Sequence, residues 1–195
     1  MTAKSDQSKE KTQETPIVLF YSHSRGPQRC FSQFYPASFR APLPDIVMKR
    51  CQGNEKSEHT SIREWNCNEQ FMHACKAMLF ADYQILELIC NEKSPAKVKQ
   101  LGRRVNNFDV KTWVTVSSEV VYLANRYKFS QNEELKQVLV QTGTAILAEA
   151  SPSDCIWGIG LAENHPDSRD PSKWQGHNLL GKALMRVRCE LVQKK

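Results

Sequence analysis

The apolar positions between residues 65 and 80 recur at the spacing of an α-helix, and this stretch organises our interpretation of the chain. Asn66 or Asn68 is suited to cap the helix, because a short side-chain acceptor satisfies a free backbone N–H of the first turn. The periodicity predicts that one face of the helix is buried. The apolar stripe on that face consists of Phe71, Met72, Cys75, Met78 and Leu79.

Three polar residues of the same helix, Glu69, His73 and Lys76, follow one another at intervals of four and three. At roughly 100° per residue, Glu69 and Lys76 point almost the same way, two turns apart. Such a pair is most often a solvated ion pair that adds a few tenths of a kcal/mol. The same pair is also suited to be a general acid/base beside a nucleophilic amine. His73 taken alone is typical of a satisfied core or boundary histidine.

Elsewhere the pattern predicts mostly helices, with one or two short strands. Ile17–Tyr21 is β-branched and aromatic and indicates a strand, and residues 145–150 indicate a short strand or a turn. The polar stretches Gln52–Ser61 and 162–177 are typical of loops. Further helices are expected after Asp82, after Ser94-Pro95, over 110–129, after Asn132 and after Asn178.

Length and composition indicate one domain. The chain has 195 residues with 40% hydrophobic and 25% charged residues, which is ordinary for a soluble globular protein. Residues 1–15 are polar with balanced charge and are expected to be a disordered tail before a domain over 16–193. No apolar run approaches the roughly 20 residues of a membrane span, and the first residues lack the apolar core of a signal peptide. We therefore expect an intracellular protein, cytoplasmic or nuclear, that does not enter a membrane.

The seven cysteines fit a reducing compartment. Their count is odd, and there is no Cys-x-x-Cys pair or close cysteine–histidine group, which argues against a disulfide framework and a structural zinc. We expect no metal and no cofactor. Cys75, Cys90, Cys155 and Cys189 each lie among apolar residues and are expected to be buried thiols.

The net charge of +6 favours anionic partners such as nucleotides, phosphates or nucleic acid. Arg103 belongs to a basic run with Lys97, Lys99 and Arg104, which is either a solvated face or a phosphate contact. The aromatic cluster Phe31–Pro36 is either a hydrophobic anchor or a surface on which a flat ring stacks. Gly158 and Gly160 permit close approach of the backbone to a ligand or an unusual φ. The chain contains no Walker loop, dinucleotide fingerprint or Gly-x-Ser-x-Gly motif.

Taken together, seven short pieces resemble the NADAR family, which includes the bacterial YbiA-like N-glycosidases. They occur in family order between about residues 17 and 192. The pieces are Phe20-Tyr21-Ser22, Phe31-Ser-Gln-Phe34, Asn68-Glu-Gln-Phe-Met-His-Ala-Cys-Lys76, Gly102-Arg103, Lys128-Phe129, Asp154-Cys-Ile-Trp-Gly158 and Gly176-His-Asn-Leu-Leu-Gly181.

The resemblance implies a mainly α, single compact helical domain that cleaves a ribosyl–nitrogen bond. Some members of the family act on ribosylated pyrimidine intermediates of riboflavin synthesis, and others remove ADP-ribose from modified guanine, including guanine in DNA. The functional glutamate and lysine of the family motif fall on Glu69 and Lys76. The resemblance thus favours the catalytic interpretation of this pair over a surface ion pair.

The chain departs from the family motif at several positions. The family's Ser-Glu-His is Asn68-Glu69-Gln70 here, so the role of that histidine is lost or passes to His73. The family's Ser-Asn-Phe has Gln33 in place of asparagine, one methylene longer. After Gly102-Arg103, the acidic–basic pair common in the family is Arg104-Val105.

The residues support a metal-independent mechanism in which Lys76 is the nucleophile, forming a Schiff base with an opened ribose, and Glu69 is its proton shuttle. Asn178 either serves only the backbone of the last helix or bonds the ligand. The competing hypotheses are a non-catalytic reader of ADP-ribose or a related nucleotide and, last, a nucleic-acid protein steered by phosphates. We expect a monomer whose partner is an ADP-ribose or ribose-phosphate substrate, including ADP-ribosylated DNA. The expected substrate-binding residues are Tyr21, Ser32, Phe34, His73, Arg103, Asp154, Trp157, Gly158 and Asn178.

Overall fold

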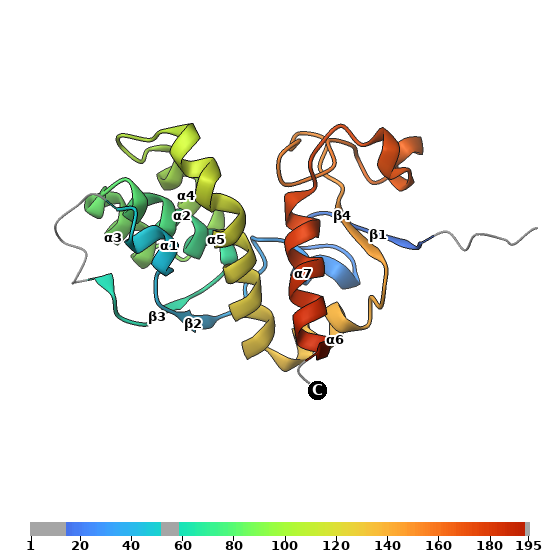
Figure 1. The fold of residues 1–195 in the computed structure, drawn as a ribbon, viewed down its shortest axis with the longest axis horizontal. Coiled ribbons are helices and arrows are strands. Elements are labelled where there is room, and N and C mark those ends of the chain that lie inside the picture. Colours follow the sequence, from blue (N-terminus) through green and yellow to red (C-terminus); the bar gives the residue numbers. More distant parts are fainter. Residues whose placement is uncertain (1–14, 52–58, 194–195) are drawn as a thin grey trace, which may run out of the picture.

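The computed structural model describes residues 15–51 and 59–193, which form seven α-helices and four short strands (Figure 1). The predicted mainly helical fold is confirmed; nearly all of the expected polar tail and most of the loop Gln52–Ser61 lie outside the described residues. No helix in the described residues is long and apolar enough to cross a membrane. The helices are α1 (Asp45–Met48), α2 (Asn68–Leu79), α3 (Tyr83–Asn91), α4 (Pro95–Arg103), α5 (Val110–Gln131), α6 (Glu133–Val140) and α7 (Leu179–Gln193), and the strands are β1 (Ile17–Phe20), β2 (Phe39–Ala41), β3 (Arg63–Trp65) and β4 (Ile146–Glu149).

Helix α5 lies between two hydrophobic clusters and belongs to both. Its residues Val116 and Val120 pack with α2 and α3, whereas Val121 and Phe129 pack with β1, β4 and α7. Figure 1 shows α2, α3 and α4 on one side of α5, with α7 and the β1–β4 pair on the other. Met72 of α2 touches both clusters. The other stripe residues, Phe71, Cys75, Met78 and Leu79, lie in the cluster with α3, so most of the expected inward stripe of α2 packs there.

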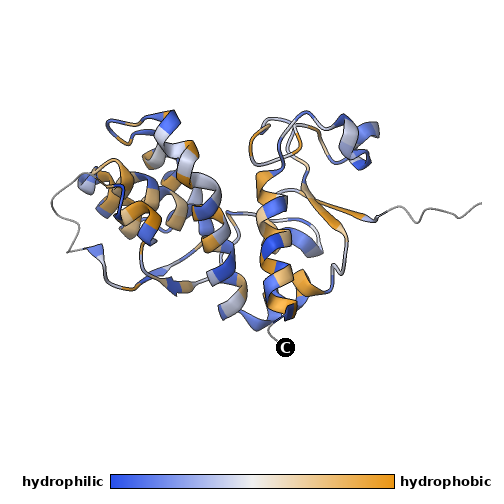
Figure 2. Ribbon diagram, in the orientation of Figure 1, coloured by the Kyte–Doolittle hydropathy of each residue, from blue (hydrophilic) through white to orange (hydrophobic). Residues whose placement is uncertain are grey.

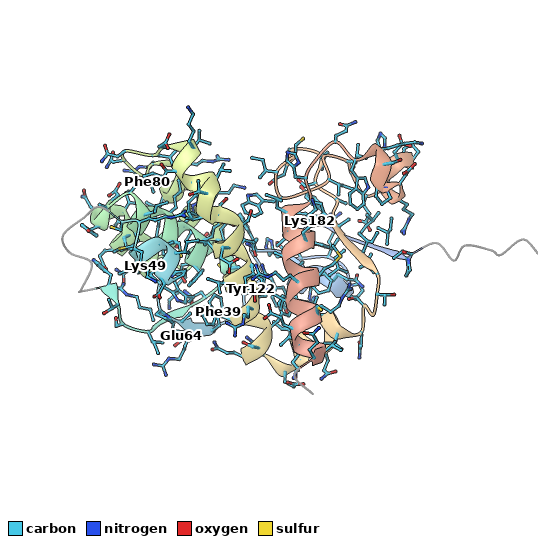
Figure 3. The ribbon with its side chains drawn as sticks, in the orientation of Figure 1. Phe39, Lys49, Glu64, Phe80, Tyr122 and Lys182 are labelled. Carbon is cyan, nitrogen blue, oxygen red and sulfur yellow. The ribbon has the colours of Figure 1, made fainter. Side chains whose placement is uncertain are left out.

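Polar contacts add to the packing between α5 and α7. The hydroxyl of Tyr122 donates to the carboxylate of Glu190, and the guanidinium of Arg186 lies 3.4 Å from the centroid of the Tyr122 ring. Arg186 also donates to Glu119 of α5 over 2.7 Å. Figure 3 shows the Tyr122 side chain between the two helices. These contacts fix α7 against α5.

Strands β1 and β4 form a parallel pair in which Ile17 lies opposite Ile146 and Phe20 opposite Glu149. Both are short apolar runs, as Figure 2 shows by their hydropathy. The predicted strand at Ile17–Tyr21 is confirmed, and residues 146–149 form a strand rather than a turn. The pairing places Glu149, a polar residue that ends an apolar strand, beside the segment that follows Phe20.

A second, antiparallel pair, β2 and β3, was not predicted. Phe39 lies opposite Trp65, and the indole N–H of Trp65 donates to the carbonyl of Ala41 over 2.9 Å. Each strand has only three residues. A run that short carries too little alternation of apolar and polar positions to be recognised in the sequence.

The predicted helices are present, but their expected caps differ. Asp82 does cap α3, accepting from the N–H of Ile85 over 3.1 Å. The helix α2 begins after Cys67, and Asn68 is its first residue rather than its cap. Ser94 and Asn132 stand at the N-caps of α4 and α6 without a capping side-chain bond. The amide of Asn132 instead donates to two carbonyls. A competing acceptor nearby thus decides where a short polar side chain bonds.

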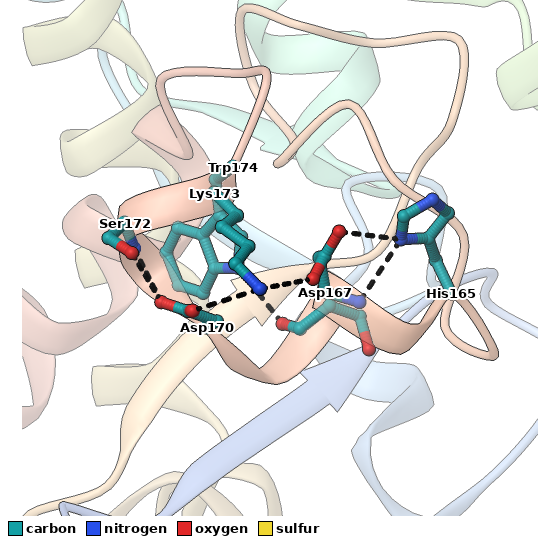
Figure 4. Close-up of polar contacts among 7 residues, drawn as sticks. His165, Asp167, Asp170, Ser172, Lys173 and Trp174 are labelled. Carbon is teal, nitrogen blue, oxygen red and sulfur yellow. Dashed lines mark hydrogen bonds and ion pairs between the residues drawn. The ribbon is translucent and has the colours of Figure 1, made fainter.

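The segment between β4 and α7 is tied together by its own polar groups (Figure 4). The amine of Lys173 lies 2.8 Å from Asp167 and 3.6 Å from Asp170. The indole of Trp174 donates to the carbonyl of Ser168 over 2.9 Å. The expected polar loop over 162–177 is therefore ordered, with two short 3-10 helices over 166–169 and 171–173.

All seven cysteines are free thiols. Cys75 is buried as expected and Cys90 is half-buried, but Cys155 and Cys189 are exposed. The prediction was wrong for the last two. Cys155 lies in the loop after β4, and Cys189 lies on the solvent side of α7, although apolar neighbours in the sequence suggested otherwise.

Candidate active site

Glu69 and His73 are buried on the side of α2 that faces α4. Nε2 of His73 lies 3.1 Å from Oε1 of Glu69. Gly102 of α4 packs on the imidazole so closely that a Cβ there would lie 1.9 Å from Nδ1. Nδ1 has no hydrogen-bond partner in the described residues. We therefore assign a ring proton to Nε2, so that His73 donates to the carboxyl group of Glu69.

Lys76 stands two turns after Glu69 on the same helix and has partners of its own. Its amine donates to the carbonyl of Gly102 over 2.7 Å and lies 3.8 Å from the centroid of the Phe108 ring. Burial lowers the pKa of this amine. The structure thus gives Glu69 and Lys76 a shared face of α2, but each is engaged by a different neighbour. The predicted direct partnership of the two side chains is not present in this structure.

Glu149, at the end of β4, is a site residue that the sequence analysis missed. Its Oε2 is buried without a hydrogen-bond partner. Burial, followed by the nearby carboxylates of Asp154 and Glu69, raises the pKa of Glu149 to about 7, while Lys99 acts in the opposite direction. Three carboxyl groups therefore lie close enough to interact electrostatically, and Glu149 readily holds a proton near neutral pH. The one sequence signal was an acidic residue closing an apolar strand.

Asn178 holds the strand end that carries Glu149. Its side-chain oxygen accepts from the backbone N–H of Glu149 over 3.2 Å, and its amide donates to the carbonyl of Leu147 over 2.8 Å. Asn178 has a φ of 50°, a left-handed conformation that asparagine tolerates better than most residues. Of the two roles expected for Asn178, the structure favours the structural one. Its side chain, however, bonds to the backbone of β4 and not to the first turn of α7.

Asp154, Trp157 and Gly158 belong to the turn that follows Glu149. One oxygen of Asp154 accepts from the N–H groups of Ile156 and Trp157 over 2.9 and 2.8 Å. A Cβ at Gly158 would lie 2.8 Å from the carbonyl of Glu149. Gly158 is therefore needed for close packing of the turn on β4, and Asp154 shapes that turn.

The loop after β1 brings Phe34 to the same region. The Phe34 ring is half-buried, with the amine of Lys99 5.5 Å and the His23 ring 5.9 Å from its centroid. Ser32 is buried, and its hydroxyl accepts from the N–H of Phe34 over 3.2 Å. The predicted contact residues Tyr21 and Arg103, by contrast, are exposed.

Three amides link this loop to α2 and α5. The side-chain oxygen of Gln33 accepts from Asn68 over 2.8 Å and from Asn125 over 3.3 Å. Asn68 also donates to Asn125 over 2.8 Å. The backbone N–H of Glu69 donates to the carbonyl of Gln33 over 3.0 Å. Loop and helix are therefore joined next to Glu69.

Unpartnered polar atoms gather around Glu69. In the described part of the chain, four buried side-chain nitrogen or oxygen atoms lack a hydrogen-bond partner, and they belong to Gln33, Asn68, His73 and Glu149. Each residue bonds to Glu69, is adjacent to it in the sequence, or acts on it electrostatically. Such atoms are costly in a protein interior, and several in one place indicate a site shaped for function. No group of three or more His, Cys, Asp or Glu in the described residues is arranged to hold a metal ion.

Residues 19–192 match the NADAR domain. The chain belongs to the NADAR family. N-glycosidase R617 of Acanthamoeba polyphaga mimivirus is 41% identical over 183 residues, spanning 92% of this chain and 99% of the relative. Protein irg-1 of Caenorhabditis elegans is 39% identical over 178 residues, which span 90% of this chain and 79% of the relative. The NMR structure of the E. coli protein YbiA superposes with a TM-score of 0.66 at 26% identity, covering 93% of this chain and 88% of YbiA.

Several of the NADAR pieces recognised in the sequence contribute contacts here, namely those that contain Gln33, Glu69, Gly102, Asp154 and Asn178. One departure from the family motif also has a structural explanation. Gln70 replaces the family's histidine after Glu69. Its amide donates to three carbonyls around the end of α3, those of Ile89, Cys90 and Glu92, over 3.0 to 3.2 Å. Its oxygen accepts from the N–H of Asn66 over 2.8 Å. Gln70 therefore joins α2 to α3, while His73 is the residue that contacts Glu69.

Proposed function

We propose that this chain is an N-glycosidase that hydrolyses a ribosyl–nitrogen bond, and that it removes ADP-ribose from ADP-ribosylated guanine in DNA or in a nucleotide. The observation that carries the proposal is the group of Glu69, Glu149 and Lys76 on and beside the NADAR motif. It combines the carboxyl group of Glu69, which bonds to His73, a second carboxyl group that retains a proton near pH 7 and an amine whose pKa is lowered by burial. N-glycosidase relatives support the reaction class.

Cleavage of the bond requires a proton on the departing base and electron density at the anomeric carbon. We assign the first task to Glu149, because its pKa of about 7 leaves much of it protonated at neutral pH. Neutral Lys76 attacks the anomeric carbon, and the electron pair of the breaking bond leaves with the base, which takes the proton of Glu149. The attacking amine passes a proton to Glu69, directly or through the substrate.

The resulting sugar amine opens its ring to a Schiff base on Lys76. Water then adds to the same carbon, the amine departs, and ADP-ribose is released with the protons redistributed between the two carboxyl groups. This sequence requires the Lys76 amine to exchange the carbonyl of Gly102 for the substrate. The lost bond is a single hydrogen bond to an uncharged acceptor, a modest net contribution of about 1 kcal/mol in proteins.

The surroundings fit a nucleotide. We assign the stacking of the base to Phe34, whose ring lies 5.5 Å from the amine of Lys99, and to Trp157, whose backbone N–H bonds to Asp154. The exposed Tyr21 is a further candidate. Arg103 is exposed at the end of α4, where it can meet a phosphate, and Lys99 adds positive charge on the same helix. The proposal requires no metal, and it takes the protein to act as a monomer on its substrate.

The direct test is incubation of the purified chain with a guanine oligonucleotide carrying ADP-ribose and, separately, with the ribosylated pyrimidine intermediate of riboflavin synthesis. Mass spectrometry of the products distinguishes the hypotheses. Released ADP-ribose with restored guanine supports the proposal, and ribose phosphate from the pyrimidine alone supports the other substrate class. Binding of ADP-ribose without turnover of either substrate would identify a reader instead of an enzyme.

A further inference from the structure

Lys128 of α5 is a fully buried lysine that the proposed chemistry does not use. Its amine donates to the carbonyl of Cys30 over 2.6 Å and to the carbonyl of Ser32 over 3.1 Å. The rings of Phe129 and Tyr35 lie 5.3 and 5.4 Å from it. Within residues 15–51 and 59–193, no carboxylate forms an ion pair with this amine.

A buried amine without an anionic partner is expensive, because the charged form loses its hydration. Burial lowers the pKa of Lys128 to about 8, with the thiols of Cys30 and Cys67 acting in the opposite direction. Burial also raises the pKa of each of these thiols. An apolar side chain of similar length would fill the space at lower cost. What Lys128 provides instead is a pair of hydrogen bonds to the backbone of a loop about a hundred residues away in the sequence.

That loop leads directly to the candidate active site. The carbonyl of Ser32 accepts both from Lys128 and from the N–H of Tyr35, which closes a turn around Gln33 and Phe34. The hydroxyl of Ser32 fixes the N–H of Phe34. The loop is thus held by Lys128 at its base and by the amide contacts of Gln33 next to Glu69.

We propose that Lys128 is a positioning residue that acts through Phe34. It holds the turn at Ser32 so that the Phe34 ring and the Gln33 amide stand preorganised for the base of the substrate. The proposal rests on the proposed function, since it assigns Lys128 a task in orienting the same substrate. A residue that only fills the core would leave the orientation of Phe34 unchanged when replaced.

The first part of the test needs no activity. Hydrogen–deuterium exchange is measured by mass spectrometry for peptides that cover residues 31–36 in the unchanged chain and in Lys128→Met. We expect faster exchange in this segment and at the N–H of Glu69, which bonds to the carbonyl of Gln33, and unchanged exchange in the last two turns of α2. Lys111→Met, at an exposed position of the same helix, is the matched control and should exchange like the unchanged chain.

The second part is a double-mutant cycle on kcat/KM with the substrate that the chain turns over. Lys128→Met and Phe34→Leu should each lower kcat/KM by about tenfold to a hundredfold, since displacement of a binding group by about 1 Å has an effect of that order. If Lys128 acts through Phe34, the double variant should be little worse than either single variant. The control pair Lys128→Met with Arg103→Leu should combine additively.

Each outcome decides the question. Additive losses for Lys128 and Phe34, or faster exchange with an unchanged kcat/KM, would overturn the positioning role. If Lys128→Met does not fold, Lys128→Gln, which keeps N–H donors without the charge, takes its place. Failure of both variants to fold would show that Lys128 serves folding alone. Absence of turnover in the unchanged chain would refute the proposed function, while the exchange result would still report whether the loop is held by Lys128.

Discussion

The α-carbon of Gly102 lies against the imidazole of His73, where a Cβ would come within 1.9 Å of Nδ1 and 2.4 Å of Cγ. Two effects of Gly102→Ala therefore oppose each other. Alanine is favoured over glycine inside a helix by about 1 kcal/mol. Overpacking a rigid site costs typically 1–3 kcal/mol, and this contact is shorter than any real Cβ contact. We expect the clash to prevail, so that Gly102→Ala lowers the free energy of unfolding and displaces His73 from Glu69.

Chemical denaturation and turnover of Gly102→Ala measure both consequences. Ala96→Gly, at an exposed position of α4, is the control and should lose about 1 kcal/mol with normal turnover. A more stable Gly102→Ala with full activity would contradict the tight packing of Gly102 on His73.

Glu149 should impose a pH dependence on turnover. As a proton donor it is active only when protonated, so kcat/KM should fall as the pH rises through about 7. Glu149→Gln should lower turnover by roughly 10²–10⁴-fold and remove this descending limb. The control Glu163→Gln, at an exposed position, should leave the profile unchanged. A normal profile in Glu149→Gln would exclude Glu149 as the acid.

The same group should make stability depend on pH. The pKa of Glu149 is raised in the folded chain from 4.5 to about 7, so the folded state binds more protons between these values. Glu149 therefore contributes on the order of 3 kcal/mol to the free energy of unfolding. This contribution is complete below about pH 4.5 and is lost as the pH rises through about 7. At pH 8, Glu149→Gln should consequently unfold at higher denaturant concentration than the unchanged chain. If the difference in denaturation midpoint between Glu149→Gln and the unchanged chain were the same at pH 5 and at pH 8, that result would contradict the raised pKa of Glu149.

Lys76 should become covalently linked to the sugar during turnover. Reduction with borohydride in the presence of substrate should add the mass of the sugar to the protein, at Lys76. Lys76→Ala should remain folded, lose turnover and resist trapping, whereas Lys97→Ala, exposed on α4, should behave like the unchanged chain. An unmodified protein mass after reduction would argue strongly against the Schiff base.

Chelation tests whether the reaction needs a metal. The mechanism assigns every proton and bond change to side chains, so turnover should persist after exhaustive treatment with a chelator. Loss of activity that added Mg²⁺ or Zn²⁺ restores would require a metal in the mechanism.

The sequence predicted the helical framework because α2, α5 and α7 each repeat apolar positions over three or more turns. Helical spacing also placed Glu69 and Lys76 on one face of α2, but it could not show that Glu69 contacts His73 whereas Lys76 contacts Gly102. The sequence did not predict Glu149, because the convergence of Glu149 with Glu69 depends on the pairing of β1 with β4 and on contacts between distant segments. The role of Asn178 was equally invisible, because its partners lie about thirty residues away in the sequence.

The most direct test of the account is Glu69→Gln, measured for turnover and for ligand affinity side by side. The change keeps size and hydrogen bonding but removes the ionisable group beside His73. We predict that turnover falls by roughly 10²–10⁴-fold while affinity for the substrate changes little. Turnover equal to that of the unchanged chain would contradict the catalytic role assigned to this face of α2.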